Sequence, residues 1–388
     1  MEIHRRRRRC FLTILTILVL QFSGYILLVN GDCQFPAIFN FGDSNSDTGG
    51  LSALFGQAIS PNGESFFNGP AGRYCDGRLI IDFIAEELGI PYINAFLDSI
   101  GSNYSHGANF ATAGSTIRPQ INTTYKDSGY SPVSLDVQYF EFDGFHRRSQ
   151  IVRRKGGIFQ EILPNNEVFS KALYTFDIGQ NDLSAGYFLN GWNFDQVKAE
   201  IPNMISQFKD IVKDVYELGG RYFWIHNTAP AGCLTYQLDR LKMITASEID
   251  KVGCSSPLNE VAQHFNNGLK EAVDQLRESL HEAAITYVDI YSVKYSLISH
   301  FKNNGFEDPF RTCCGHGGRF NYNVSNGCGY KAVINGEEVL VGSCDDPARA
   351  VNWDGYHFTQ AANKFVFDKI VDGSFSDPPI PLKMACNR

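Results

Sequence analysis

The chain has 388 residues, of which 43% are hydrophobic, 20% are charged and 13% are aromatic. These fractions are ordinary for a globular protein and exclude a disordered, fibrous or low-complexity chain. The formal net charge of −8 disfavours DNA or RNA as a partner, because a nucleic-acid binder of this size usually carries a positive charge.

The N-terminus carries the features of a secretory signal. A basic run at residues 5–9 precedes an apolar stretch at residues 11–29, and the small residue Gly31 follows. We therefore expect residues 1–31 to be a cleaved signal peptide. Its loss would change the formal charge from −8 to −12, because five arginines and one glutamate leave with it. The alternative is a retained signal anchor, since the apolar stretch approaches the roughly 20 residues that span a bilayer.

Two further features agree with secretion. Three N-x-S/T triplets, at Asn103, Asn122 and Asn323, are candidate glycosylation sites. Ten cysteines become nine when Cys10 leaves with the signal, and an oxidising compartment would pair most of them and leave one over. Zinc ligation is the alternative for the four cysteines within residues 313–344. That stretch has no C-x-x-C pair, which favours disulfides.

Short apolar strands alternate with amphipathic helices along the mature chain. Strands are expected at 36–41, 172–178, 221–225 and 285–290, and helices at 79–88, 197–218, 258–280 and 359–371. This alternation predicts a parallel sheet covered by helices on both faces, in a single domain of residues 32–388. The long loops at 56–77 and 305–346 exceed simple turns, and loops of this length are usually functional or stapled.

A serine after the first expected strand is the candidate nucleophile. Ligands of parallel α/β sheets bind beyond the carboxyl ends of the strands, which is where Ser44 stands. A serine hydroxyl needs an adjacent base to react. The alternative role for Ser44 is a helix N-cap, because Ser44-x-x-Asp47 resembles a capping box. Ser46 is a competing nucleophile in the same loop.

An Asp-x-x-His pair near the C-terminus supplies the candidate base. An imidazole side chain ordinarily titrates near neutrality, so His357 is suited to accept the Ser44 proton, while Asp354 would hold its tautomer. The alternative is that the pair only begins the last helix. Acyl transfer also needs donors for an oxyanion, and the candidates are the Asn181 side chain and the N–H groups of Gly107 and Ser44.

Taken together, four sequence blocks resemble the plant GDSL-type lipase/esterase family within the S-G-N-H hydrolases. They are FGDSNSDTG at 41–49, GANFA at 107–111, GQND at 179–182 and DGYH at 354–357. The resemblance implies a three-layer α/β/α fold of flavodoxin-like type with a central parallel sheet. It also implies Ser44 as nucleophile, Gly107 and Asn181 in the oxyanion hole, and Asp354 with His357 as orienter and base. No metal or cofactor is needed for this chemistry.

The resemblance extends to an acetylesterase and nodulin-like subgroup. It implies a secreted carboxylic-ester hydrolase that acts on a small-molecule or glycan ester and favours short acyl groups. We expect a monomer of the apoplast or cell wall, with the vacuole as an alternative, and no stable membrane association after signal removal. Some relatives have been called α-fucosidases, so a glycosidase is the alternative, although no carboxylate pair marks one. An acyltransferase would use the same residues.

Overall fold

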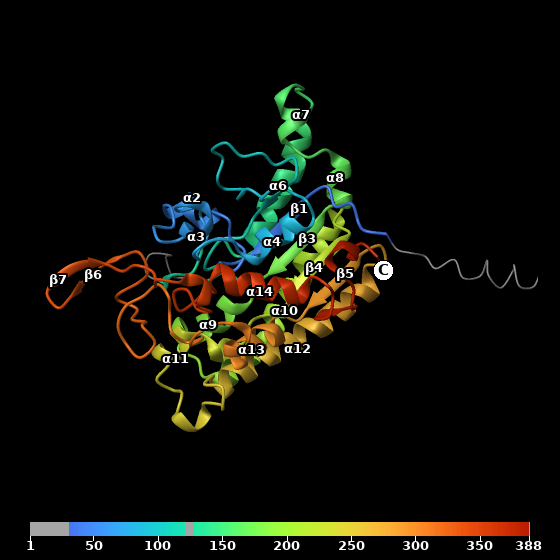
Figure 1. Cartoon of the computed structure of the whole chain (residues 1–388). Coiled ribbons are helices and arrows are strands. Elements are labelled where there is room, and N and C mark those ends of the chain that lie inside the picture. The colour runs from blue at the N-terminus through green and yellow to red at the C-terminus, as the bar shows by residue number, and fades with distance from the viewer. Residues whose placement is uncertain (1–30, 121–127, 388) are drawn as a thin grey trace, which may run out of the picture.

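A β-sheet lies at the centre of the molecule, and helices cover both of its faces (Figure 1). The computed structural model of the chain describes residues 31–120 and 128–387. The predicted signal peptide, apart from Gly31, lies outside the described residues. The same is true of Cys10 and of the candidate glycosylation site Asn122.

The described part of the sheet has six strands in the order β2-β1-β3-β4-β5-β8. Their bounds are β1 Ile38–Gly42, β2 Gly107–Asn109, β3 Leu173–Asp177, β4 Tyr222–His226, β5 Ala284–Val288 and β8 Ser376–Asp377. Neighbouring strands from β2 to β5 pair in parallel, and Ile38 stands opposite both Gly107 and Leu173. The short edge strand β8 pairs antiparallel with β5. The sheet is therefore parallel as predicted, with one antiparallel edge strand that the sequence pattern did not indicate.

Strand side chains alternate between two hydrophobic cores, and each core is closed by its own layer of helices. Phe39 and Phe41 of β1 point into one core, and Ile38 points into the other. The first core is covered by α6 Leu135–Arg153, α8 Asn166–Lys171, α10 Phe194–Glu217 and α12 Ser256–Ser279. The second is covered by α4 Ile80–Glu87, α13 Ile290–Ser299 and α14 Gln360–Ile370. This is the predicted three-layer α/β/α fold.

The strand order fixes the place of a ligand site. The order 2-1-3-4-5 is that of flavodoxin-like sheets, in which ligands bind where the order reverses. In this sheet the reversal falls between β1 and β3, at their carboxyl ends. The loops after Gly42 and Asp177 therefore flank the expected crevice.

The expected strands and helices are all present, and further elements lie between them. The remaining helices and strands are α2 Gly50–Phe55, α3 Glu64–Phe67, α7 Ile158–Ile162, α9 Gln180–Phe188, α11 Thr235–Arg240, β6 Lys331–Ile334 and β7 Glu337–Leu340. The sequence pattern missed α6, whose exposed Phe140 and Ile151 interrupt a regular apolar stripe. Among the described helices, none combines the length and the apolar character needed to cross a bilayer.

Disulfides join eight of the nine cysteines of the described chain. The pairs are Cys33–Cys386, Cys233–Cys254, Cys313–Cys344 and Cys314–Cys328. Cys75 is buried and is the one cysteine left unpaired among the described residues. The prediction of disulfides with one cysteine left over is confirmed, and all four cysteines of the 313–344 stretch are paired rather than free to bind zinc.

Candidate active site

The candidate site is a cavity of about 360 Å³ at the carboxyl ends of β1 and β3. Ser44, Asn181 and His357 line it together, although 313 residues separate the first from the last. Gly114 and Tyr74 also line it. The fold therefore brings three of the predicted site residues to one place, at the crevice that the strand order indicates.

The turn after β1 is fixed by backbone contacts that hold Ser44 at the cavity. The Asp43 N–H donates to the Asp177 carbonyl at 3.1 Å. The Gln138 side chain from α6 accepts from the Gly42 N–H at 2.9 Å and donates to its carbonyl at 2.8 Å. A Cβ at Gly42 would lie 2.5 Å from the Asp177 carbonyl, so only glycine fits this turn.

Ser44 is not a helix cap. Helix α2 begins only after Gly49, and the Asp47 carboxylate accepts from the N–H groups of Gly49 and Gly50 at 2.7 and 2.5 Å. Asp47 therefore caps the start of α2, a role that the sequence pattern also allowed for Ser44. Ser46 is 3% exposed, and its hydroxyl accepts from Asn40 at 3.0 Å, which gives Ser46 a structural role.

Asp354 and His357 form a hydrogen-bonded pair. His357 Nδ1 lies 2.7 Å from Asp354 Oδ2, and the other carboxylate oxygen accepts from the N–H groups of Tyr356 and His357, each at 2.9 Å. A carboxylate at this position favours the Nδ1–H tautomer, which leaves Nε2 free to accept a proton. His357 and Ser44 face the same cavity without a direct hydrogen bond in the described structure. Such bonds often tighten only when substrate binds.

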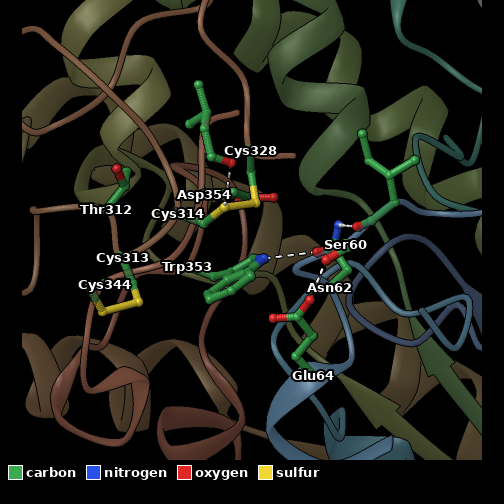
Figure 2. The surroundings of a disulfide bond; sticks show 12 residues. Ser60, Asn62, Glu64, Thr312, Cys313, Cys314, Cys328, Cys344, Trp353 and Asp354 are labelled. Atoms are coloured by element: carbon green, nitrogen blue, oxygen red, sulfur yellow. Dashed lines mark hydrogen bonds between the residues drawn. A yellow bond between two sulfur atoms is a disulfide. The ribbon is translucent and has the colours of Figure 1, made fainter. Parts of the chain in front are cut away.

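Two disulfides support the loop that carries this pair. The N–H groups of Cys313 and Cys314 donate to the carbonyls of Asn352 and Trp353 at 2.9 and 2.6 Å. Figure 2 shows Trp353 beside these disulfides, with its indole N–H donating to Asn62 Oδ1 at 2.9 Å. Trp353 is fully buried. The loop at residues 305–346, called the cysteine-rich loop below, therefore fixes the backbone that precedes Asp354 together with Asn62.

Asn181 stands at the start of α9, in the loop that follows β3. Its Nδ2 donates to the Ser115 carbonyl at 2.9 Å and to Asp43 Oδ2 at 3.3 Å. The longer of these two contacts is the weaker one. The hydrogen directed toward Asp43 is therefore the one that an oxyanion in the cavity could compete for.

Gly107 does not lie at this site. It begins β2 and pairs with Ile38, the first residue of β1, whereas Ser44 follows the opposite end of β1. Four strand steps of about 3.3 Å already separate these ends by roughly 13 Å. The Gly107 N–H also donates to the Tyr104 carbonyl at 3.0 Å. The prediction that Gly107 supplies an oxyanion donor is therefore wrong. Glycine is required at position 107 because a Cβ there would lie 1.8 Å from the Ile38 carbonyl.

Gly114, rather than Gly107, lines the Ser44 cavity. It lines the cavity with a φ of +82°, and a Cβ there would lie 2.6 Å from the Gly129 carbonyl. Asp47 accepts from the neighbouring Ala113 N–H at 2.7 Å, which ties this turn to the Ser44 loop. Sequence reasoning missed Gly114 because it stands three residues beyond the end of the GANFA block, after a strand whose length the sequence did not show.

Asp182 holds the other end of the Gly114 turn. Its carboxylate accepts from the N–H groups of Ile117 and Arg118 at 2.8 and 3.1 Å. Burial raises the pKa of Asp182 to about 7, and these backbone donors oppose the shift. Asp47 and Asp182 thus fix the turn from both sides, so that the Gly114 N–H keeps one position.

A buried group of charges lies behind the Ser44 loop. Burial raises the pKa of Asp43 to about 7, and the nearby Asp177 carboxylate adds to this shift. Burial alone would also raise the pKa of Asp177, but a 3.1 Å hydrogen bond from His226 Nδ1, together with electrostatic attraction from His226 and Lys294, holds that pKa below its ordinary value. The buried Lys294 has a lowered pKa because of desolvation, which both aspartates oppose.

A serine, a histidine–aspartate pair and amide donors around one cavity are the parts of a serine-type acyl-transfer site on an α/β sheet. Comparison with known proteins identifies the family. Residues 38–370 match the family described as GDSL-like Lipase/Acylhydrolase. The chain therefore belongs to the GDSL lipase/acylhydrolase family, and it is a carboxylic-ester hydrolase.

Several curated plant proteins are similar to this chain over nearly their whole length. A protein named Alpha-L-fucosidase 3 from Arabidopsis thaliana is 61% identical over 92% of this chain and 93% of the relative. A GDSL esterase/lipase from Zea mays is 59% identical over 92% of this chain and 90% of the relative. A protein named Esterase from Hevea brasiliensis is 54% identical over 92% of this chain and 90% of the relative.

Proposed function

We propose that the protein is a secreted serine esterase that removes short acyl groups from a small-molecule or glycan ester through an acyl-enzyme. The observation that carries the proposal is that Ser44, Asn181 and His357 line one cavity, with Asp354 hydrogen-bonded to the histidine. The family match supports ester hydrolysis as the reaction.

In the proposed mechanism Ser44 Oγ attacks the ester carbonyl while His357 Nε2 takes its proton. The carbonyl oxygen becomes an oxyanion that accepts from Asn181 Nδ2, the Gly114 N–H and the Ser44 N–H. The bond to the alcohol then breaks, and His357 returns the proton to the leaving oxygen. Water, deprotonated by His357, attacks the acyl-enzyme, and the carboxylic acid leaves as Ser44 regains its proton.

Buried tyrosines close one part of the Ser44 cavity, which supports a short acyl group. Phe188, Tyr130 and Tyr236 form part of its wall, and the Tyr130 hydroxyl lies 2.9 Å from Ser184 Oγ. Tyr130 and Tyr236 are both buried, so the cavity ends against packed side chains there. An acetyl group fits such a wall more readily than a long chain does.

Surface features support secretion and glycosylation. Asn103 and Asn323 are exposed, and each side-chain oxygen accepts from the N–H of its own sequon serine at 2.9 Å. Four disulfides within the described chain fit an extracellular protein. We propose that Asn103 carries a glycan, and Asn323 stays a candidate site.

The cavity does not favour a glycosidase, although one relative is named a fucosidase. Most glycosidases place two carboxyl groups roughly 5 to 9.5 Å apart across the scissile bond. No aspartate or glutamate is among the described residues that line the Ser44 cavity. An acyltransferase would use the same side chains with an alcohol in place of water.

The test is hydrolysis of p-nitrophenyl esters from acetate to palmitate by the secreted protein and by its Ser44→Ala variant. We expect fastest turnover of the shortest esters, and a kcat at least about 10³-fold lower in the variant. Near-normal turnover by Ser44→Ala would exclude the mechanism, and fastest turnover of palmitate would exclude the short acyl group. A crystal structure of an organophosphonate adduct should place the phosphonyl oxygen about 3 Å from Asn181 Nδ2 and the Gly114 nitrogen.

A further inference from the structure

A second cavity, of about 420 Å³, adjoins the Ser44 cavity. The two share Leu51, Tyr74 and Tyr356 in their walls, so they lie side by side. Asp354, the partner of His357, also lines the second cavity. Its volume falls within the roughly 300–1,000 Å³ of small-molecule sites.

The position of the second cavity suits the alcohol half of an ester. Asn181 and Gly114 line only the first cavity, so the oxyanion and the acyl group belong there. His357 must protonate the leaving oxygen, which places the alcohol on the side of the Asp354–His357 loop. That loop forms the boundary between the two cavities.

The wall of the second cavity is aromatic and polar but carries no cation. No lysine, arginine or histidine is among its described lining residues. Its one carboxyl, Asp354, is already hydrogen-bonded to His357. A phosphate-bearing or otherwise anionic alcohol would therefore find no counter-charge here.

Neutral residues with amide side chains are in the wall of this cavity. Gln57 and Asn326 are two of them, and neither side-chain amide makes a hydrogen bond to a described residue. A fatty or quaternary-ammonium alcohol would strip water from these amides without replacing its hydrogen bonds, which is unfavourable. An alcohol with several hydroxyl groups would satisfy them.

Tyr330 adds a flat apolar surface at the rim. The residue is 65% exposed, while its backbone is held by hydrogen bonds to Gly327 and Val341 at 3.1 and 2.9 Å. The face of an aromatic ring is electron-rich, so it attracts the polarised C–H groups on one face of a sugar ring. An exposed ring on a fixed backbone beside free amides is therefore a suitable surface for a saccharide.

We propose that the second cavity binds a neutral saccharide as the alcohol half of the ester, with Tyr330 as its stacking surface. This inference rests on the proposed function, because it assigns the leaving group of the same Ser44 site. The saccharide hydroxyls bond to Gln57 and Asn326, and the ester oxygen reaches toward His357.

The first test measures binding without catalysis. The Ser44→Ala protein is titrated calorimetrically with acetylated cellobiose, which it should bind without consuming. The double variant that carries both Ser44→Ala and Tyr330→Ala should bind acetylated cellobiose about tenfold more weakly than Ser44→Ala alone. The matched control is the double variant that carries Ser44→Ala and Val333→Ala. Val333 is another exposed side chain of the same hairpin and does not line the cavity. This variant should change binding less than about twofold. Absence of binding, or equal binding by the Tyr330→Ala and Val333→Ala proteins, would overturn the proposal.

The second test compares leaving groups on the wild-type protein. Acetylated cellobiose should be hydrolysed with a higher kcat/KM than methyl acetate or acetylcholine, and Tyr330→Ala should lower kcat/KM for the saccharide ester alone. Preference for acetylcholine would overturn the saccharide assignment. Failure of the proposed function is a separate result: the Ser44→Ala protein would still bind acetylated cellobiose, but the wild type would hydrolyse no p-nitrophenyl ester.

Discussion

At the scale of single residues, the proposed oxyanion site depends on how Asn181 is held. Its amide nitrogen donates to the Ser115 carbonyl and, at a longer distance, to Asp43. The Ser115 contact orients the amide, and the Asp43 contact can be exchanged for a contact to substrate. Asn181 is therefore both a donor and a link between the loops that follow β1, β2 and β3.

We predict that Asn181→Ala lowers kcat about 10²- to 10³-fold with a smaller change in KM, because the lost donor acts mainly on the oxyanion. Steady-state kinetics on p-nitrophenyl acetate measure both values. Asn190→Ala is the control, since Asn190 follows α9 and does not line the cavity. An unchanged kcat in Asn181→Ala would remove this side chain from the oxyanion site.

We predict that His226→Ala destabilises the protein at pH 7 by about 2 kcal/mol, because it removes a hydrogen bond to the buried Asp177 carboxylate. In the wild type that contact, together with electrostatic attraction from His226 and Lys294, overcomes burial and holds the pKa of Asp177 below its ordinary value. Its stabilising effect is therefore present above pH ~4 and is lost as the pH falls through the lowered pKa.

Urea unfolding at pH 7 and at lower pH measures this effect. The stability difference between wild type and His226→Ala should shrink as the pH falls, because a protonated Asp177 needs the donor less. His264→Ala, on the exposed side of α12, should stay within about 0.5 kcal/mol of wild type. A difference that does not vary with pH would show that the His226 effect is packing alone.

At the scale of structural elements, the cysteine-rich loop acts as a brace for the Asp354–His357 turn. The N–H groups of Cys313 and Cys314 donate to the carbonyls of Asn352 and Trp353, directly before Asp354. The long loop at 305–346 is thus neither a separate unit nor a simple connection. It positions the base from one side and forms a wall of the second cavity on the other.

We predict that replacing Cys314 and Cys328 together by serine lowers kcat about tenfold or more, because the turn that holds His357 loses its brace. Esterase kinetics and thermal unfolding are measured on the same sample. The control pair is Cys233→Ser with Cys254→Ser, a disulfide that closes a loop of similar length elsewhere. We expect that pair to lose stability with less effect on kcat, and equal kcat losses in both pairs would contradict the bracing role.

At the scale of the whole molecule, the Cys33–Cys386 disulfide joins the two ends of the described chain across 353 residues of sequence. Cross-links restrict the unfolded chain, and the effect grows with loop length. We predict that replacing both cysteines by serine lowers the free energy of unfolding by about 2–4 kcal/mol without changing kcat. Calorimetry and esterase assays measure the two quantities. An unchanged melting temperature would contradict the prediction.

Much of the fold followed from local pattern. The strands and helices expected from hydrophobic periodicity are present, since each buries its apolar residues against the sheet or a helix layer. Strand β2 was missed because three residues carry too little periodicity to identify a strand. The assignment of Gly107 failed for the same reason: the motif glycine lies inside that strand, opposite Ile38.

The sequence by itself determined the order of elements, the reactive residue types and the pairing of Asp354 with His357, because these depend on neighbours a few residues apart. The tertiary structure decided which glycine lies beside Ser44, how the cysteines pair, and where a second cavity opens. Those features depend on strand register and on contacts between segments hundreds of residues apart, and only the packed chain fixes them.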